Sequence, residues 1–179
     1  MMRAAASLLV GGLFCCFFCL ACGGDDPRDL EAELAALPGV TVEKTETNQP
    51  FYTYYVLRFT QPVDHDAPAG QTFQQKVSLL HKDFEAPMVA LTSGYHDYYN
   101  DVTSELTNLV FGSQISIEHR YFAESRPEPA DWTKLTIAQM AADQHHIIEL
   151  LKGVYDVPWL TTGGSKGGMT ASYHNRFYP

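Results

Sequence analysis

A serine with two glycines on each side lies late in the sequence, between a short apolar run and a segment with helical character. The stretch is Gly163-Gly164-Ser165-Lys166-Gly167-Gly168, with one Gly-x-Ser-x-Gly match. A serine in this pattern occupies a sharp strand-to-helix turn that exposes its hydroxyl, and glycines are needed where side chains would collide with neighbouring backbone. The pattern therefore predicts a nucleophile at Ser165, with a strand before it and a helix after it.

Two other structures could account for this glycine-rich stretch. One is a turn in which Ser165 only caps the following helix, because serine is a favoured N-cap residue. The other is a phosphate-binding loop, but that motif needs Gly-Lys followed directly by Ser or Thr. The order here is Ser165-Lys166-Gly167. We therefore reject the phosphate-binding loop and keep capping as the structural alternative.

Strand and helix patterns alternate through the second half of the chain. Short apolar runs are typical of strands that are covered on both faces. Thr136 and Gln139 have the spacing of a capping box, and an apolar stripe follows them as far as Gly153. The expected order is strand 87–92, helix from an Asp101 cap to Gly112, strand 114–121, Pro-rich loop 126–131, helix 136–153, strand 157–162, the elbow and a last helix.

This order predicts the fold class. A strand–helix–strand succession requires a mostly parallel sheet with helices on both faces. Residues 51–60 and 72–81 are rich in β-forming side chains and predict two antiparallel strands with a longer connection. We therefore expect an α/β fold of the α/β-hydrolase type, in which residues 38–179 are an incomplete domain: the N-terminal half of the sheet with flanking helices, ending just after the elbow.

The first 22 residues differ from the rest of the chain. Arg3 precedes an almost wholly apolar run at 4–21, which predicts an export signal. Leu20-Ala21-Cys22 resembles the end of a bacterial lipoprotein signal, although Cys19 stands where leucine is usual. We expect lipidation of Cys22 and a membrane anchor in the cell envelope. A signal cleaved elsewhere, which would give a secreted protein, and an uncleaved anchor are the alternatives; residues 23–37 are predicted to be an acidic tether.

Composition argues against several classes of site. All four cysteines (Cys15, Cys16, Cys19 and Cys22) lie in the expected signal, so no disulfide or cysteine-ligated metal is expected in the body. The formal charge of -9 predicts no nucleic-acid partner. The group Asp143, His145 and His146 lacks the i,i+4 histidine pair of a helical zinc site. We expect no metal site at these residues, and nothing in the sequence defines the oligomeric state.

A nucleophilic serine needs an oxyanion hole and a base. The backbone amides of Lys166, directly after the serine, and of Tyr95, after strand 87–92, are the expected oxyanion donors. The acid and the histidine of a triad follow the serine in this fold. Residues 166–179 contain one imidazole, His174, and no carboxylate. His174 is predicted to be an ordinary helical residue, so two triad members are missing from the sequence.

Three stretches, taken in order, resemble one family. They are Glu118-His119-Arg120-Tyr121-Phe122-Ala123-Glu124-Ser125-Arg126-Pro127, then Asp143-Gln144-His145, then the elbow. They are similar to the serine peptidases typified by bacterial secreted tripeptidyl aminopeptidases, and in turn to the prolyl carboxypeptidase and dipeptidyl peptidase II group. The resemblance covers residues 50–179, with Ala123 where glycine is expected, and it identifies the N-terminal portion of such an enzyme.

The resemblance implies an exported exopeptidase that releases short peptides from free N-termini through an acyl-enzyme on Ser165. It also implies that no metal or organic cofactor takes part, and that the acid and the histidine lie downstream. A peptidase of this kind must bind the ammonium group of its peptide substrate, and Glu118 and Glu124 could do so. Structural ion pairs of these glutamates with Arg120 or Arg126 are the alternative. Two other functions stay open: an esterase or lipase of the same fold, and a non-catalytic, lipid-anchored surface protein.

Overall fold

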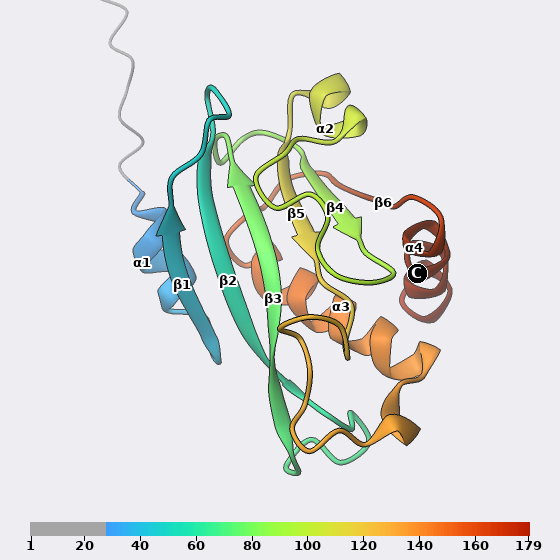
Figure 1. Ribbon diagram of the computed structural model, residues 1–179. Helices are drawn as coiled ribbons and strands as arrows, with labels where there is room; N and C mark the ends of the chain where they lie inside the picture. The colour runs from blue at the N-terminus through green and yellow to red at the C-terminus, as the bar shows by residue number, and fades with distance from the viewer. Residues whose placement is uncertain (1–27) are drawn as a thin grey trace, which may run out of the picture.

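Six strands form one mixed sheet in the computed structural model, which describes residues 28–179 (Figure 1). Their order across the sheet is β1-β2-β3-β5-β4-β6. The expected signal and Cys22 lie outside the described residues. The strands are β1 (Val40–Thr45), β2 (Thr53–Pro62), β3 (Thr72–His81), β4 (Met88–Thr92), β5 (Ser113–Ile117) and β6 (Trp159–Thr162); the helices are α1 (Leu30–Ala35), α2 (Glu105–Val110), α3 (Ile137–Lys152) and α4 (Lys166–Phe177), with a 3-10 turn η1 (Trp132–Lys134).

The strands before residue 87 form the antiparallel half of the sheet. β1 pairs with β2, β2 with β3 and β3 with β5, all antiparallel. Buried and partly exposed side chains alternate along most of β2, because one of its faces packs against the core. The predicted pair of strands at 51–60 and 72–81 is confirmed, with Leu57 opposite Val77.

The strands after residue 87 form the parallel half. β4 pairs in parallel with β5 and with β6. Every residue of β4 and β5 is buried, as expected for central strands with layers on both faces. The α/β class and its element order are confirmed. The described strands make a mixed sheet, since the N-terminal strands add three antiparallel pairs to these two parallel ones.

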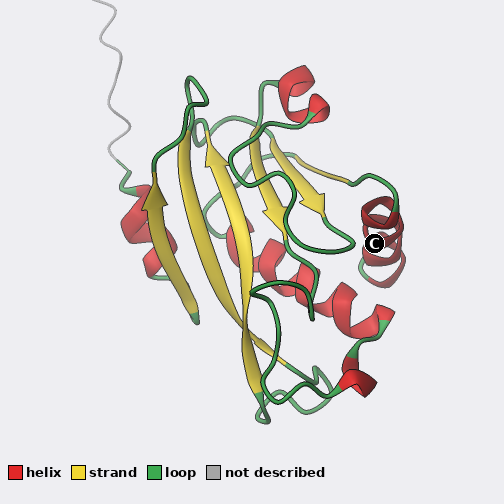
Figure 2. Ribbon diagram, in the orientation of Figure 1, coloured by secondary structure: helices red, strands yellow, loops and turns green. Residues whose placement is uncertain are grey.

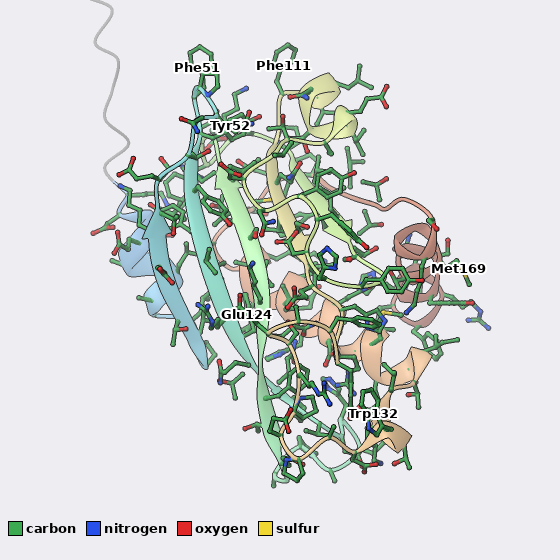
Figure 3. The ribbon with its side chains drawn as sticks, in the orientation of Figure 1. Phe51, Tyr52, Phe111, Glu124, Trp132 and Met169 are labelled. Atoms are coloured by element: carbon green, nitrogen blue, oxygen red, sulfur yellow. The ribbon has the colours of Figure 1, made fainter. Side chains whose placement is uncertain are left out.

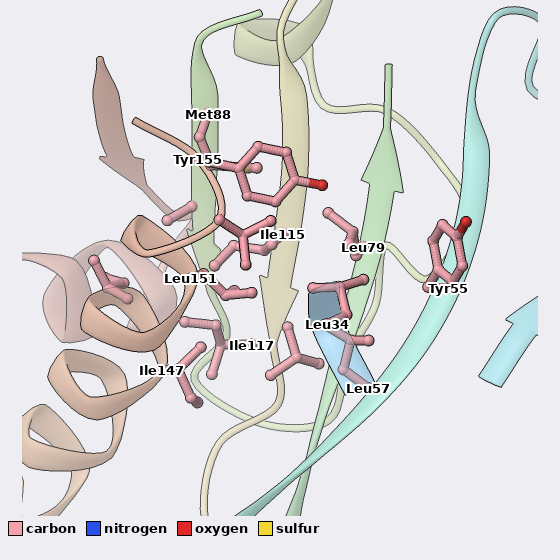
Figure 4. Close-up of a cluster of buried hydrophobic side chains, with 14 of the residues drawn as sticks. Leu34, Tyr55, Leu57, Leu79, Met88, Ile115, Ile117, Ile147, Leu151 and Tyr155 are labelled. Carbon is pink, nitrogen blue, oxygen red and sulfur yellow. The ribbon is translucent and has the colours of Figure 1, made fainter. Parts of the chain in front are cut away.

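Helices cover both faces of the sheet (Figure 2). α3 lies behind the strands in this view, whereas α2 lies near the top of the opposite face. α4 packs beside α3 and against β4 and β6. None of the helices in residues 28–179 is long and apolar enough to span a membrane. The main core lies between the sheet and the layer of α1 and α3, and Figure 4 shows ten of its side chains: Leu34, Tyr55, Leu57, Leu79, Met88, Ile115, Ile117, Ile147, Leu151 and Tyr155.

The N-terminal boundary of the folded body differs from the prediction. α1 lies inside the expected tether, yet Leu30 and Leu34 belong to the core. Asp29 caps this helix by accepting a hydrogen bond from the Ala32 amide. β1, which the sequence patterns did not indicate, follows directly and pairs with β2. The described part of the expected tether is therefore not a solvated spacer, and the body begins before residue 38.

Two element boundaries are also corrected. The helix expected from an Asp101 cap starts three residues later, because the Ser104 hydroxyl accepts a hydrogen bond from the Thr107 amide and caps α2. The strand expected over 114–121 ends at Ile117. Beyond it the chain turns away, with Tyr121 in a left-handed conformation at φ 69°. The residues that follow β5 are thus free to form a loop beside the carboxyl ends of the strands.

A buried ion pair fixes that loop to α3. Arg120 and Asp143 are both fully buried, with Nε to Oδ2 at 2.6 Å and Nη2 to Oδ1 at 2.8 Å. Arg120 also donates to the carbonyls of Val63 and Lys134 at 3.0 and 2.8 Å. His65, in the loop after β2, lies 2.7 Å from Asp143 Oδ1 through its Nε2 atom. One guanidinium therefore joins the loop after β2, the loop after β5 and η1 to α3.

We expect Asp143→Asn to destabilise the fold strongly. It leaves the buried Arg120 guanidinium without a counter-charge, which costs about 3–5 kcal/mol in comparable buried pairs. Glu149→Gln, on the same helix, breaks only the exposed pair with Lys152 and should change stability by less than about 1 kcal/mol. Urea unfolding of the two variants measures the difference. Equal losses of stability would contradict the role given to the buried pair.

Candidate active site

Ser165 lies between β6 and α4 in a strained backbone conformation, with φ 53° and ψ -123°. Such a conformation costs a non-glycine residue about 1–3 kcal/mol and persists only where the surroundings impose it. Ser165 is exposed and its side chain makes no capping hydrogen bond to α4. The turn therefore presents the hydroxyl to solvent, as a nucleophile elbow does, and the capping alternative is not what the structure shows.

Three of the four glycines are required by contacts with backbone. A Cβ on Gly167 would overlap the carbonyl oxygen of Thr92, and one on Gly163 would lie 2.7 Å from the same oxygen. A Cβ on Gly168 would lie 2.9 Å from the Gly163 oxygen. Gly164 has no neighbour within 4 Å of an added Cβ. The elbow is therefore pressed against the carboxyl end of β4 at Gly163 and Gly167.

Two threonine hydroxyls hold this contact, and the sequence patterns did not single them out. Thr92 Oγ1 donates to the Gly167 carbonyl at 2.8 Å. Thr170 Oγ1 lies 2.7 Å from the same carbonyl and 2.9 Å from Thr92 Oγ1. Both threonines are buried. A polar residue closing an apolar strand directly before Ser93-Gly94 was the signal that could have identified Thr92.

The two expected oxyanion donors differ in their surroundings. Lys166 is the first residue of α4, and its amide makes no hydrogen bond among the described residues. An unpaired amide beside the nucleophile suits a developing oxyanion. The Tyr95 amide instead donates to Ser93 Oγ at 3.0 Å. It would have to leave that hydroxyl to serve an oxyanion, so its part in the hole stays a prediction.

A cavity opens directly beside the elbow. It has a volume of about 360 Å³. Ser165 and Lys166 line one side, and Tyr95, Tyr98 and Tyr99 from the loop after β4 line the other. The cavity lies at the carboxyl ends of the parallel strands, where ligands bind in α/β folds. A substrate carbonyl placed over Ser165 would therefore have an aromatic pocket next to it.

Glu118 does not have either of its expected roles. It is buried, and its Oε2 accepts the Asp97 amide at 3.0 Å. Its Oε1 accepts the amides of Glu124 and Ser125 and the Ser125 hydroxyl at 2.9 to 3.1 Å. It therefore pairs with neither Arg120 nor Arg126 and has no place for a substrate ammonium. Instead it ties the loop that carries Tyr95 to the loop after β5.

Glu124 also differs from the prediction. It is exposed and forms an ion pair with Arg58 of β2 at 2.7 Å. A second, longer ion pair joins it to Lys76 of β3 at 3.9 Å. Figure 3 shows Glu124 in front of the sheet and well separated from Met169 on α4. Glu124 thus takes part in an ion pair, although with a different arginine, and it lies away from the elbow.

No base reaches the nucleophile from residues 28–179. Among these residues, no imidazole or carboxylate hydrogen-bonds to the Ser165 hydroxyl, and no group of three metal-binding side chains could hold a metal ion. His174 is buried on α4, 5.8 Å from the Tyr178 ring centroid, and burial lowers its pKa. It is a helix-packing residue, as predicted. The described residues therefore supply an exposed serine on a strained turn, one free backbone amide beside it and a pocket.

These features define the class of fold as that of the α/β-hydrolases, with an exposed serine at the turn between β6 and α4. Solved structures agree on the fold: acetyl xylan esterase 1 from Thermoanaerobacterium sp. JW/SL YS485 has a TM-score of 0.56 at 13% identity, covering 83% of this chain and 52% of its own. The acetyl xylan esterase of Paenibacillus sp. R4 has a TM-score of 0.54 at 15% identity, covering 80% of this chain and 51% of its own. At such low identity the likeness concerns the fold alone.

The family follows from the sequence comparisons. The family model described as PS-10 peptidase S37 matches residues 25–179, so the chain belongs to this family of serine peptidases. It is 49% identical to the prolyl tri/tetrapeptidyl aminopeptidase of Streptomyces mobaraensis over 151 residues, 84% of this chain and 31% of that protein. It is 30% identical to the lysosomal Pro-X carboxypeptidase of Mus musculus over 150 residues, 70% of this chain and 30% of that protein. The chain thus spans about a third of the length of these relatives.

We expect Gly167→Ala to destabilise the protein by about 1–3 kcal/mol, the usual cost of overpacking. The added methyl group would meet the Thr92 carbonyl, which is part of the sheet and cannot move aside cheaply. Gly164→Ala is the matched control, because nothing lies near its added methyl group. Its effect should stay within about 0.5 kcal/mol. Thermal unfolding of both variants checks this, and a harmful Gly164→Ala with a neutral Gly167→Ala would contradict the assigned contacts.

Proposed function

We propose that this chain carries the nucleophile of an exported serine exopeptidase that releases short peptides, tripeptides among them, from free N-termini. The supporting observation is Ser165 itself, exposed on a strained elbow beside an aromatic cavity and free of any capping bond. Membership of a peptidase family and the identity to an aminopeptidase favour peptides as the substrate class.

The proposed reaction proceeds through an acyl-enzyme. Ser165 Oγ bonds to the carbonyl carbon while its proton passes to a base, and the Lys166 amide donates to the oxyanion. The scissile C–N bond then breaks, and the leaving amine takes the proton. Water attacks the ester in turn, which releases the N-terminal peptide with a free carboxylate and restores the hydroxyl of Ser165.

This activity requires partners for Ser165 beyond those in residues 28–179. A serine hydroxyl is too weak a nucleophile at neutral pH without an adjacent base and the acid that orients it. The family resemblance implies an acid and then a histidine downstream of the elbow, which is the chain order expected for this fold. We therefore propose activity for a full-length gene product in which such an acid and histidine follow this sequence.

Export rests on the first 22 residues. Their charge and apolar run suit a signal, and Cys22 suits lipidation, which would hold the enzyme at the cell envelope. A peptidase placed there would act on peptides outside the cytoplasm. Metabolic labelling with an acyl-chain probe tests the anchor: Cys22→Ser should lose the label, while Cys19→Ser should keep it. A label retained by Cys22→Ser would contradict lipidation at this position.

Hydrolysis by the full-length gene product tests the peptidase assignment. We expect it to release p-nitroaniline from a tripeptide with a free N-terminus, and to act poorly on the same tripeptide N-acetylated and on p-nitrophenyl acetate. Ser165→Ala should lower kcat at least about 10³-fold. Ser172→Ala, whose hydroxyl only contacts the Gly168 carbonyl on α4, is the control. Preference for the simple ester would contradict a peptidase and favour an esterase.

A further inference from the structure

Lys166 stands between two cavities. It directly follows Ser165 in the chain, and it lines both the tyrosine-lined cavity beside Ser165 and a second cavity of about 260 Å³. The second cavity lies between α3, α4 and the loop after β5, with Met169 on α4 visible in Figure 3. Its lining includes His119, Ile137, Met140, Met169 and Tyr173. The Lys166 side chain therefore forms part of the wall between the two cavities.

The position of this side chain is fixed by close packing. Gly94 makes room for it, since a Cβ on Gly94 would lie 2.5 Å from Lys166 Cβ and 2.6 Å from Cγ. The ammonium nitrogen lies 4.6 Å from the Tyr95 ring centroid and 5.0 Å from that of Phe122. These two rings meet edge to face at 5.3 Å. A cation held over two aromatic faces is attracted by them and stays in place.

The ammonium keeps its hydrogen-bonding capacity. An ammonium has three donors and no acceptor, and ring faces do not take up all of them. Among the described residues, Lys166 Nζ has no hydrogen bond and no ion pair within 4.0 Å. It is partly exposed. The donors therefore point to a partner that residues 28–179 do not provide.

The charge balance of the cavities selects the partner. No aspartate or glutamate of residues 28–179 lines either cavity, and Lys166 is the one lining residue with a formal charge. Burial lowers the pKa of His119, and the charge of Lys166 lowers it further. His119 is therefore neutral at pH 7, with Nδ1 donating to the Arg120 carbonyl at 2.8 Å. Both cavities favour an anion and disfavour a substrate ammonium.

We infer that Lys166 binds a carboxylate of the substrate next to the scissile bond. This inference rests on the proposed function, in which the substrate is a peptide. Two groups on a peptide supply the same chemistry: the C-terminal carboxylate of a short peptide, and the side chain of an aspartate or glutamate. Either would form a charge-assisted hydrogen bond with the ammonium while an adjacent carbonyl group lies over Ser165. The free N-terminus then binds outside these two cavities.

Binding to the full-length gene product carrying Ser165→Ala tests the inference without need of turnover. Calorimetry would compare two pairs of tetrapeptides. The first pair is a tetrapeptide with a free C-terminal carboxylate and the same peptide as its C-terminal amide. The second pair is two C-terminal amides that differ only in having Glu or Gln at position four. We expect a carboxylate in at least one pair to tighten binding roughly tenfold, the factor of one charge-assisted hydrogen bond. Adding Lys166→Met to the Ser165→Ala protein should abolish this roughly tenfold ratio of the two dissociation constants, and adding Lys166→Arg should largely keep it.

The matched control and the two pairs separate the outcomes. Lys152→Met removes a positive charge that pairs with Glu149 on α3, and it should leave the ratio unchanged. A ratio only in the acid–amide pair assigns the C-terminal carboxylate, and a ratio only in the Glu–Gln pair assigns the side chain. Equal affinities in both pairs, no binding at all, or a ratio that survives Lys166→Met would overturn the inference. Failure of the proposed function would appear separately: the full-length gene product with Ser165 unchanged would bind these peptides but not cleave them.

Discussion

The close approach of the elbow to the end of β4 is the constraint on which the site depends. Gly163 and Gly167 both meet the Thr92 carbonyl oxygen, and the hydroxyls of Thr92 and Thr170 hold the Gly167 carbonyl from the other side. This contact joins β4, β6 and α4 at one point, which keeps Ser165 in a conformation it would not adopt alone. The position of the hydroxyl, the free Lys166 amide and the aromatic cavity all follow from it.

Local patterns predicted the elbow, the order of elements and the capping of α3 by Thr136, because short-range geometry determines each of them. The roles of Glu118, Arg120 and Asp143 could not be predicted in this way. Arg120 and Asp143 are 23 positions apart, and Arg120 also holds carbonyls more than 50 positions away. The packing of α1 against the core, and the strand β1, were missed for a similar reason: the acidic and polar composition of these residues suggests a solvated segment, while Leu30 and Leu34 find their partners only across the core.

The charged residues around the site divide into two groups. Glu118, Arg120 and Asp143 are buried and fully paired, so they position the loops that carry Tyr95 and the β5 exit. Lys166 is held by aromatic rings and keeps its donors. Resemblance to a peptidase family made the two glutamates candidates for substrate recognition, with structural ion pairs as the alternative. Burial and hydrogen bonding assign Glu118 to structure, and Glu124 forms an exposed ion pair with Arg58, whereas we propose that Lys166 binds the substrate.

The central claim is that the elbow makes Ser165 a nucleophile. A fluorophosphonate probe followed by peptide mass spectrometry, applied to the folded full-length gene product, tests it most directly. The account predicts one covalent adduct on Ser165, absent after heat unfolding and in Ser165→Ala and retained in Ser172→Ala. Folded protein that takes up no probe, or an adduct on another serine with Ser165 unmodified, would contradict the account.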